Sequence, residues 1–192
     1  MTRNLALLLS ICFLMTGCGS SLYRVKPVTQ LPALPDNSRS ASAGGVTVRV
    51  APLLSDEETQ ELFEVNLPLA GVLPVRMEMA FESGVPVEIK RARFRLRDAE
   101  GREWKLLTPK GAISRILKAN EVFAYNPHSR KEFEKEFGSY AIELKEPLTD
   151  SDRRRQGFLF FQTPTGEPVR SNQGLVLTIE RLPQPIELSL GN

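Results

Sequence analysis

The chain has 192 residues, of which 41% are hydrophobic and 25% are charged. These proportions are those of a globular protein, and the length suits one domain but hardly two. The formal net charge is only +2. Nucleic-acid binding depends on many unopposed Lys and Arg side chains that face phosphates, so the near-neutral charge argues against a nucleic-acid partner.

Residues 1–17 have the layout of a secretory signal peptide. Arg3 gives the start a positive charge, an apolar run follows from Leu5 to Met15, and the segment ends in the small residues Thr16 and Gly17. A helix that spans a bilayer needs about 20 apolar residues. The run is shorter than that, so we expect a signal peptide that is removed and not a permanent membrane anchor.

The junction Leu14-Met15-Thr16-Gly17-Cys18 resembles the lipobox of bacterial lipoproteins, with Met15 where Leu is commonest. The resemblance implies cleavage after Gly17, a diacylglycerol on the sulfur of Cys18 and an acyl group such as palmitate on the new amino group. Two or three acyl chains hold a protein firmly on a membrane, since each buried methylene contributes about 0.8 kcal/mol. The alternative is an ordinary secretory peptide with an unrelated cysteine.

In that family the residue after the lipidated cysteine directs sorting. Gly19 is not the aspartate that retains many such proteins at the inner membrane. The resemblance therefore implies a location in the cell envelope, on the outer membrane and facing the periplasm where the host has two membranes. The expected partners are the membrane itself, through Cys18, and another protein of the envelope.

The stretch from Cys18 to Gly45 predicts a flexible tether, because it is rich in proline and small residues and poor in large apolar ones. As a flexible coil it would span about 30 Å. In the alternative arrangement, Leu22 and Tyr23 dock on the domain or on the lipid interface. The folded domain is expected over residues 46–192, with a helical insertion at about residues 108–150.

Alternation between apolar and polar residues recurs in this domain and predicts antiparallel strands with one buried face. It is found at residues 46–50, 75–81, 175–179 and 186–190. The stretch Gln156–Gln162 is instead continuously apolar in its middle. This pattern predicts a central strand that is buried on both faces.

Turn-forming residues separate further strands and predict a meander of strands at residues 73–82, 87–97 and 102–107. The second of these strands has an irregular pattern, because its apolar residues change from odd to even positions after Ile89. A one-residue β-bulge near Lys90 and Arg91 would keep both sets of apolar residues on the core side. We therefore predict a bulge at this point.

Three helical pieces are expected within the domain. The segments Ser55–Glu58 and Ser129–Glu132 have the spacing of a capping box, in which Ser and Glu satisfy backbone N–H groups at a helix start. The second of these helices is expected to end at Gly138. Residues 111–119 predict another helix, whose apolar face consists of Ile113, Ile116 and Leu117.

The order of strands resembles the immunoglobulin-like β-sandwich domains of bacterial envelope lipoproteins. The resemblance rests on the strand Val72–Phe81, its partner strand ending at Arg97, the strand Gly157–Phe161 and the final pair over residues 174–190. The Cys and Trp hallmarks of antibody domains are missing. The resemblance implies a mainly β fold, an immunoglobulin-like antiparallel β-sandwich with short helical insertions, and it implies no particular activity.

Groups that support catalysis are scarce in this sequence. His128 is the only histidine and precedes an expected helix, so we interpret it as a loop residue and not as a catalytic one. No serine lies in a Gly-x-Ser-x-Gly elbow, and an acylated Cys18 cannot act as a nucleophile. A second histidine, a free thiolate and a calcium-loop pattern are all missing. We therefore expect no cofactor, no metal and no enzymatic activity.

Four arginines, Arg91, Arg93, Arg95 and Arg97, alternate along one expected strand. In a hairpin with a four-residue turn, Arg95 lies opposite Trp104 and its guanidinium stacks on the indole. Such a face suits acidic sugars, phosphorylated lipid headgroups or an acidic protein surface. The alternative is a solvated sheet face that nearby acids balance, such as Glu78, Glu82 and Glu100.

Two functions are consistent with this sequence. The first is a non-catalytic lipoprotein whose domain binds or scaffolds another component of the cell envelope. The alternative is a module that binds a small ligand, a glycan or a lipid headgroup on a face formed by Arg91, Arg93, Arg95, Arg97 and Trp104.

Overall fold

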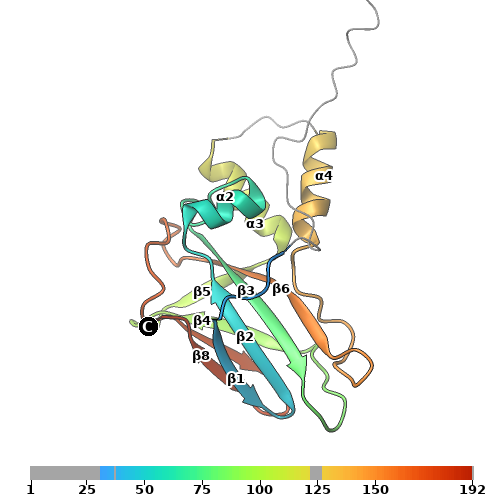
Figure 1. Cartoon of the computed structure of the whole chain (residues 1–192). Helices are drawn as coiled ribbons and strands as arrows, with labels where there is room; N and C mark the ends of the chain where they lie inside the picture. Colours follow the sequence, from blue (N-terminus) through green and yellow to red (C-terminus); the bar gives the residue numbers. More distant parts are fainter. Residues whose placement is uncertain (1–30, 37, 122–126, 192) are drawn as a thin grey trace, which may run out of the picture.

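The structure is a computed structural model that describes residues 31–36, 38–121 and 127–191. These residues form mainly antiparallel β structure, with eight strands and three helices (Figure 1). The helices are α2 (Asp56–Phe63), α3 (Pro109–Ala119) and α4 (Pro127–Gly138). The strands are β1 (Arg39–Ala43), β2 (Val46–Pro52), β3 (Val72–Phe81), β4 (Arg93–Arg97), β5 (Glu103–Leu107), β6 (Arg154–Gln162), β7 (Val176–Glu180) and β8 (Ile186–Ser189).

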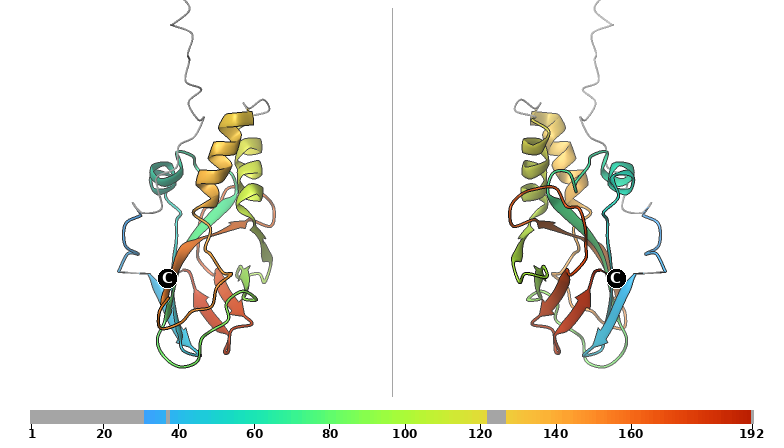
Figure 2. Two further views of the ribbon diagram at one scale, coloured as in Figure 1. Left: turned by 90° about the vertical axis from the view of Figure 1, so that its right-hand side faces the viewer. Right: turned by 90° about the vertical axis from the view of Figure 1, so that its left-hand side faces the viewer.

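The strands follow one another across the sheet in the order β1-β2-β3-β6-β5-β4-β7-β8, and every neighbouring pair is antiparallel. The two edge strands, β1 and β8, lie next to each other, so the sheet is nearly closed. Figure 2 shows from two sides that the helices gather at one end of the strands. The expectation of a mainly β, antiparallel fold with short helical insertions is confirmed.

Strand β6 separates two hydrophobic cores. Leu159 and Phe161 point into the core enclosed by the sheet, whereas Phe158 and Phe160 point into a second core beneath the helices. Strands β3 and β5 flank β6 on its two sides. The prediction of a central strand buried on both faces is therefore confirmed.

Aromatic side chains fill the core beneath the helices. The ring of Phe63 from α2 lies 5.3 Å from that of Phe137, 5.1 Å from that of Tyr140 and 5.5 Å from that of Phe158, measured between ring centroids. Aromatic pairs at such distances add about 0.5–1.5 kcal/mol beyond the area that they bury. The cluster attaches α2 and α4 to the sheet.

One helix start and one helix face follow the predicted signals. Ser55 caps α2, and its hydroxyl accepts a hydrogen bond from the backbone N–H of Glu58 at 3.2 Å. The predicted face of α3, formed by Ile113, Ile116 and Leu117, is buried, although the helix begins at Pro109, two residues before the predicted start.

The predicted capping box at Ser129 is wrong. Helix α4 already begins at Pro127, so Ser129 is its third residue and cannot be the cap. Proline is favoured at the first position of a helix, because its fixed φ suits the helix and its missing N–H would have had no partner there. The predicted end at Gly138 is confirmed.

The predicted meander is only partly correct. Strand β4 pairs with β5 as expected, but its other partner is β7, and β3 pairs with β2 and β6. The stretch before β4 does not extend that strand, because Val87 pairs with Leu148 instead. Strand β3 thus pairs with the strand that precedes it in the chain and with β6 from a distant part of the chain.

The predicted β-bulge near Lys90 and Arg91 is also wrong. A turn takes its place, in which the N–H of Ala92 donates to the carbonyl of Ile89 at 3.0 Å. This turn restores the alternation, so that Ile89 before it and Phe94 after it are both buried. The change of apolar phase in the sequence correctly indicated an irregularity at this point, but the irregularity is a turn and not a bulge.

Strand β1 belongs to the sheet, although the sequence analysis placed residues 18–45 in the tether. Gly44 and Gly45 form a two-residue hairpin turn between β1 and β2, with φ of +58° and +80°. Glycine adopts such positive φ values without steric cost, and turns of this kind match the twist of a hairpin. The domain therefore begins before residue 46, while residues 1–30, with Cys18, Leu22 and Tyr23, lie outside the described residues.

Candidate functional site

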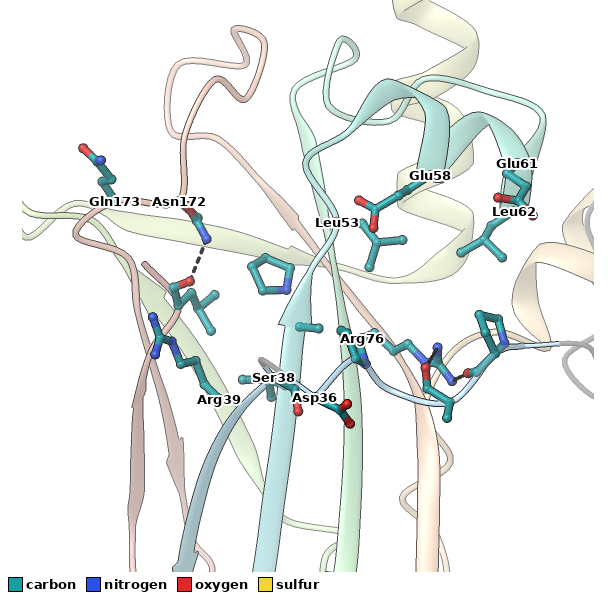
Figure 3. Close-up of a pocket in the computed structure, with 17 residues that line it drawn as sticks. Asp36, Ser38, Arg39, Leu53, Glu58, Glu61, Leu62, Arg76, Asn172 and Gln173 are labelled. Carbon is teal, nitrogen blue, oxygen red and sulfur yellow. Dashed lines mark hydrogen bonds between the residues drawn. The ribbon is translucent and has the colours of Figure 1, made fainter. Parts of the chain in front are cut away.

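A cleft of about 930 Å³ lies at the helical end of the sheet. One of its long sides is helix α2, and the other is the segment that precedes β1, here called the strap (residues 31–36 and 38) (Figure 3). The loop that contains Asn172 and Gln173 closes one end. Pro52, Leu53 and Leu62 supply apolar surface to the lining.

Two arginines hold the strap on the sheet. Arg76 of β3 is only 6% exposed, and its guanidinium donates to the backbone carbonyls of Pro32 and, at 3.5 Å, of Ala33. Arg49 of β2 donates to the hydroxyl of Ser38 at 2.9 Å. The side chain of Leu34 is also buried. The strap therefore has a defined place beside the cleft.

The environment of Arg76 explains why a charged residue is tolerated in a buried strand. Burial lowers the pKa of Arg76, while the neighbouring carboxylate of Glu78 and the phenol of Tyr140 oppose this shift. Burial also raises the pKa of Tyr140 to about 12. An arginine in a protein stays protonated at neutral pH, so Arg76 is a buried cation whose charge meets carbonyl oxygens and a carboxylate.

Carboxylates line both long sides of the cleft. Glu58 and Glu61 come from α2, and Asp36 comes from the strap (Figure 3). Arg39, at the start of β1, donates to the carbonyl of Gly191 at 3.1 Å. At the closed end, the side-chain amide of Asn172 donates to the carbonyl of Leu190 at 2.6 Å. The cleft thus combines apolar side chains with hydrogen-bonding and charged groups, an arrangement that suits recognition of a ligand.

No sequence pattern predicts this cleft. The alternation in β3 places Arg76 on the face opposite the enclosed core, where its guanidinium contacts the strap. Two apolar residues in the predicted tether were a signal that this segment packs on the domain. Leu34 is buried, and Leu31 packs against the core beneath the helices. No pattern in the sequence links either residue to β3.

The predicted arginine face is present, and its central arginine is paired with two carboxylates. Arg93, Arg95 and Arg97 alternate with the buried residues of β4 and define the β4 arginine face, whereas Arg91 lies outside the strand. The guanidinium of Arg95 contacts both carboxylate oxygens of Glu103, with one N–O distance of 2.5 Å. It also reaches Glu180 on β7 at 3.3 Å.

The predicted stacking of Arg95 on Trp104 is wrong. Trp104 lies opposite Leu96, not Arg95, and it is only 8% exposed on the core side of β5. The register differs by one residue from the predicted one, and a shift of one residue exchanges the two faces of a strand. The observed register buries the indole and brings Glu103 out beside Arg95, which avoids burying a carboxylate.

The acids that pair with the β4 arginine face are not the ones that the sequence suggested. Glu78 is 8% exposed and lies 3.7 Å from Arg154, and Glu100 pairs with Arg102. The hydrogen bond from Arg95 is the main reason why the pKa of Glu103 is low. Within the described residues, Arg93 and Arg97 have no hydrogen-bond or ion-pair partner. The face is therefore partly neutralised and retains these two exposed cations.

A smaller cleft of about 190 Å³ lies beside the β4–β5 turn, where Asp98, Arg102 and Trp104 meet the loop that follows β6. Desolvation raises the pKa of Asp98, but the hydrogen bonds and the charge of Arg102 outweigh it, with a smaller contribution from the indole of Trp104, so the net shift is downward. The indole N–H of Trp104 is buried and has no hydrogen-bond partner among the described residues.

Within the part of the chain that the structure describes, no group of three or more His, Cys, Asp or Glu side chains is placed to hold a metal ion. None of the helices in that same part combines the length and the apolar composition needed to span a bilayer. The side chain of His128 and the thiol of Cys18 lie outside the description. No protein-family model matches this sequence, and comparisons with curated proteins and with solved structures gave no match.

Proposed function

We propose that this chain is a lipoprotein of the bacterial cell envelope whose domain binds another envelope protein in the cleft between α2 and the strap, without catalysing a reaction. The cleft carries this proposal. It is a hollow of about 930 Å³, and its lining combines the apolar side chains of Pro52, Leu53 and Leu62 with carboxylates and amides. Protein recognition sites combine apolar and polar groups in this way.

The membrane attachment is proposed from the sequence alone. A signal peptide that ends at Gly17 and a lipidated Cys18 would place the domain on a membrane, and Gly19 favours the outer membrane with the domain in the periplasm. Mass spectrometry of the mature N-terminal peptide tests this directly. A diacylglyceryl group on Cys18 is expected, and an unmodified peptide that begins elsewhere would contradict it.

We further propose that the fold is an immunoglobulin-like β-sandwich with one sheet of β1, β2, β3 and β6 and a second of β4, β7 and β8. The support is that, among the hydrogen-bonded strand pairs, β5 alone connects the two halves. It pairs with β4 through two residues and with β6 through three. Two sheets that share so short a bridge can pack face to face. A solved structure that superimposes on such a domain would test the assignment.

Photocrosslinking in the host membrane tests the proposed binding site. A photoreactive amino acid is placed at Gln173 or Ala33, both on the walls of the cleft, and for comparison at Lys105 on the outer face of β5. We expect one dominant protein adduct from the two cleft positions and none from Lys105. Adducts from Lys105 alone would move the site to the β4 arginine face.

The β4 arginine face is the second candidate, as a binding surface for an anionic small ligand, a glycan or a lipid headgroup. The exposed cations Arg93 and Arg97 favour it. The burial of Trp104 weakens it, because the stacking surface is lost. Replacement of both cations by Ser should abolish any such interaction, while the adducts from the cleft should remain.

A further inference from the structure

We propose that the cleft takes an extended, basic segment of the partner protein, one that carries Lys or Arg side chains. This inference rests on the proposed function, since it names the chemistry of the partner that binds there. The shape of the groove and the placement of charges support it.

The cleft continues along the sheet as a groove. A second hollow of about 340 Å³ lies between β1 and β8, and its lining shares Arg39 with the cleft. Ser40 lines it from β1, and Glu187 and Ser189 line it from β8. The two hollows together extend from α2 along the line where β1 and β8 meet, here called the seam. An elongated groove of this kind suits an extended chain better than a compact ligand.

The seam leaves no room for a strand inside the sheet. Strand β1 pairs with β2 and β8 pairs with β7, and none of the backbone hydrogen bonds found in the described residues joins β1 to β8. The two strands nevertheless lie next to each other, whereas a strand inserted between them would need a separation of about 9.5 Å. A bound extended segment would therefore lie over the seam and contact the side chains that line it.

The strap shows that an extended segment is already recognised at this end of the sheet. It has no helix or strand over residues 31–35, and the sheet holds it through Arg76, which donates to its backbone carbonyls. The guanidinium of Arg76 therefore recognises the main chain of the strap and not a particular side chain. A second extended segment, supplied by the partner, would lie in the cleft between the strap and α2.

The charges around the groove favour a basic occupant. Its lining contains the carboxylates of Asp36, Glu58, Glu61 and Glu187. The lining also contains two cations, Arg39 and Arg76, so its four acids outnumber its bases by two. Helix α2 adds Asp56 and Glu57 in its first turn and has no basic residue. Complementary charge steers association and selects partners, so Lys and Arg side chains are the expected match.

Peptide binding to the purified full-length lipoprotein in detergent micelles tests this charge preference. The probes are a labelled peptide of alternating lysine and proline, which is extended in solution, and the same peptide with glutamate for lysine. We expect the lysine peptide to bind and the glutamate peptide not to bind, as measured by fluorescence anisotropy. Equal binding of the two peptides, or binding of neither, would overturn the proposal.

Charge variants locate the binding. The double variant Glu58→Lys and Glu61→Lys should weaken binding of the lysine peptide by about tenfold or more. The matched control, Glu82→Lys and Glu88→Lys, makes the same charge change at exposed positions near the opposite end of β3 and should change binding by less than about twofold. The isosteric variant Glu58→Gln and Glu61→Gln should weaken binding by about threefold, which guards against misfolding of the lysine variant. Equal effects at both sites would contradict the proposal.

The photocrosslinking experiment separates this inference from the proposed function. A crosslinked partner segment with a net positive charge supports both. A neutral or acidic partner segment overturns the basic occupant but leaves the binding function intact. Adducts between two copies of this chain overturn the choice of a partner protein, and the absence of adducts at every position overturns both proposals.

Discussion

The guanidinium of Arg76 in β3 donates to the backbone carbonyl of Pro32, which lies 44 residues earlier in the chain. This contact joins a buried cation in the sheet to the segment that connects the domain with the N-terminal region. It also forms one wall of the candidate binding cleft. A single side chain therefore supports both the placement of the strap and the shape of the site.

Replacement of Arg76 by Ala should release the strap. The variant loses hydrogen bonds from a charged donor and leaves Glu78 with less neighbouring positive charge, so we expect a loss of about 1.5–3 kcal/mol in the free energy of unfolding. Urea denaturation measures this loss, and hydrogen exchange should show faster exchange of amides in the strap. The exposed Arg91→Ala variant is the control and should change stability by less than about 0.5 kcal/mol. Unchanged exchange in the strap would contradict the role of Arg76.

Replacement of Ser55 by Ala should weaken α2 and with it one wall of the cleft. The serine hydroxyl accepts the N–H of Glu58, and loss of such a cap costs about 1 kcal/mol. The Ser55→Gly variant should cost only a few tenths of a kcal/mol, because glycine is tolerated at this position. Urea denaturation of the two variants distinguishes them. Equal losses would show that the hydroxyl does not act as a cap.

Replacement of Gly157 by Ala should be severely destabilising. A Cβ atom at this position in β6 would lie 2.5 Å from both the Cα and the N atoms of Ile142, and backbone atoms cannot move aside as a flexible side chain can. We expect a loss of about 3 kcal/mol or a failure to fold. Gly138→Ala is the matched control, since a Cβ there meets no atom within 4 Å, and its thermal melting should be nearly unchanged. A stable Gly157→Ala variant would contradict the close approach of these segments.

The β4–β5 turn should lose stability in acid because of Asp98. Its carboxylate accepts the backbone N–H of Arg102 at 2.9 Å and its guanidinium Nε at 2.8 Å. These contacts help keep the pKa of Asp98 below its ordinary value of 3.8 despite desolvation. A lowered pKa means that the stabilisation is complete above the ordinary pKa and is lost as pH falls through the lowered one.

The Asp98→Asn variant tests this dependence. Its melting temperature at neutral pH should be lower than that of the parent chain, and the difference between the two should shrink as the pH falls through the acid range. The physical reason is that protonation of Asp98 removes the carboxylate charge from the parent chain, and the Asn substitution has already removed that charge from the variant. A difference that stays constant or grows in acid would exclude Asp98 as the titrating group.

The sequence by itself determined the features that depend on neighbouring residues. The apolar run in β6, the cap at Ser55 and the apolar face of α3 were all predictable, because periodicity and capping act within one or two turns of chain. The change of apolar phase before β4 was predictable as well, although its cause was not. These local signals were enough to indicate a mainly β domain with short helices.

Only the tertiary structure decided which strands pair and which polar groups are buried. The register of β4 and β5 turned Trp104 into the core, and the strap buried Arg76. The first outcome depends on the register of a hairpin, and the second depends on a contact between distant segments. A shift of one residue in register exchanges the buried and exposed faces of a strand, and a covering segment buries a side chain that would otherwise face water. The cleft follows from the same long-range contacts, since its walls come from the strap, α2 and the loop at Asn172, and no single stretch of sequence contains it.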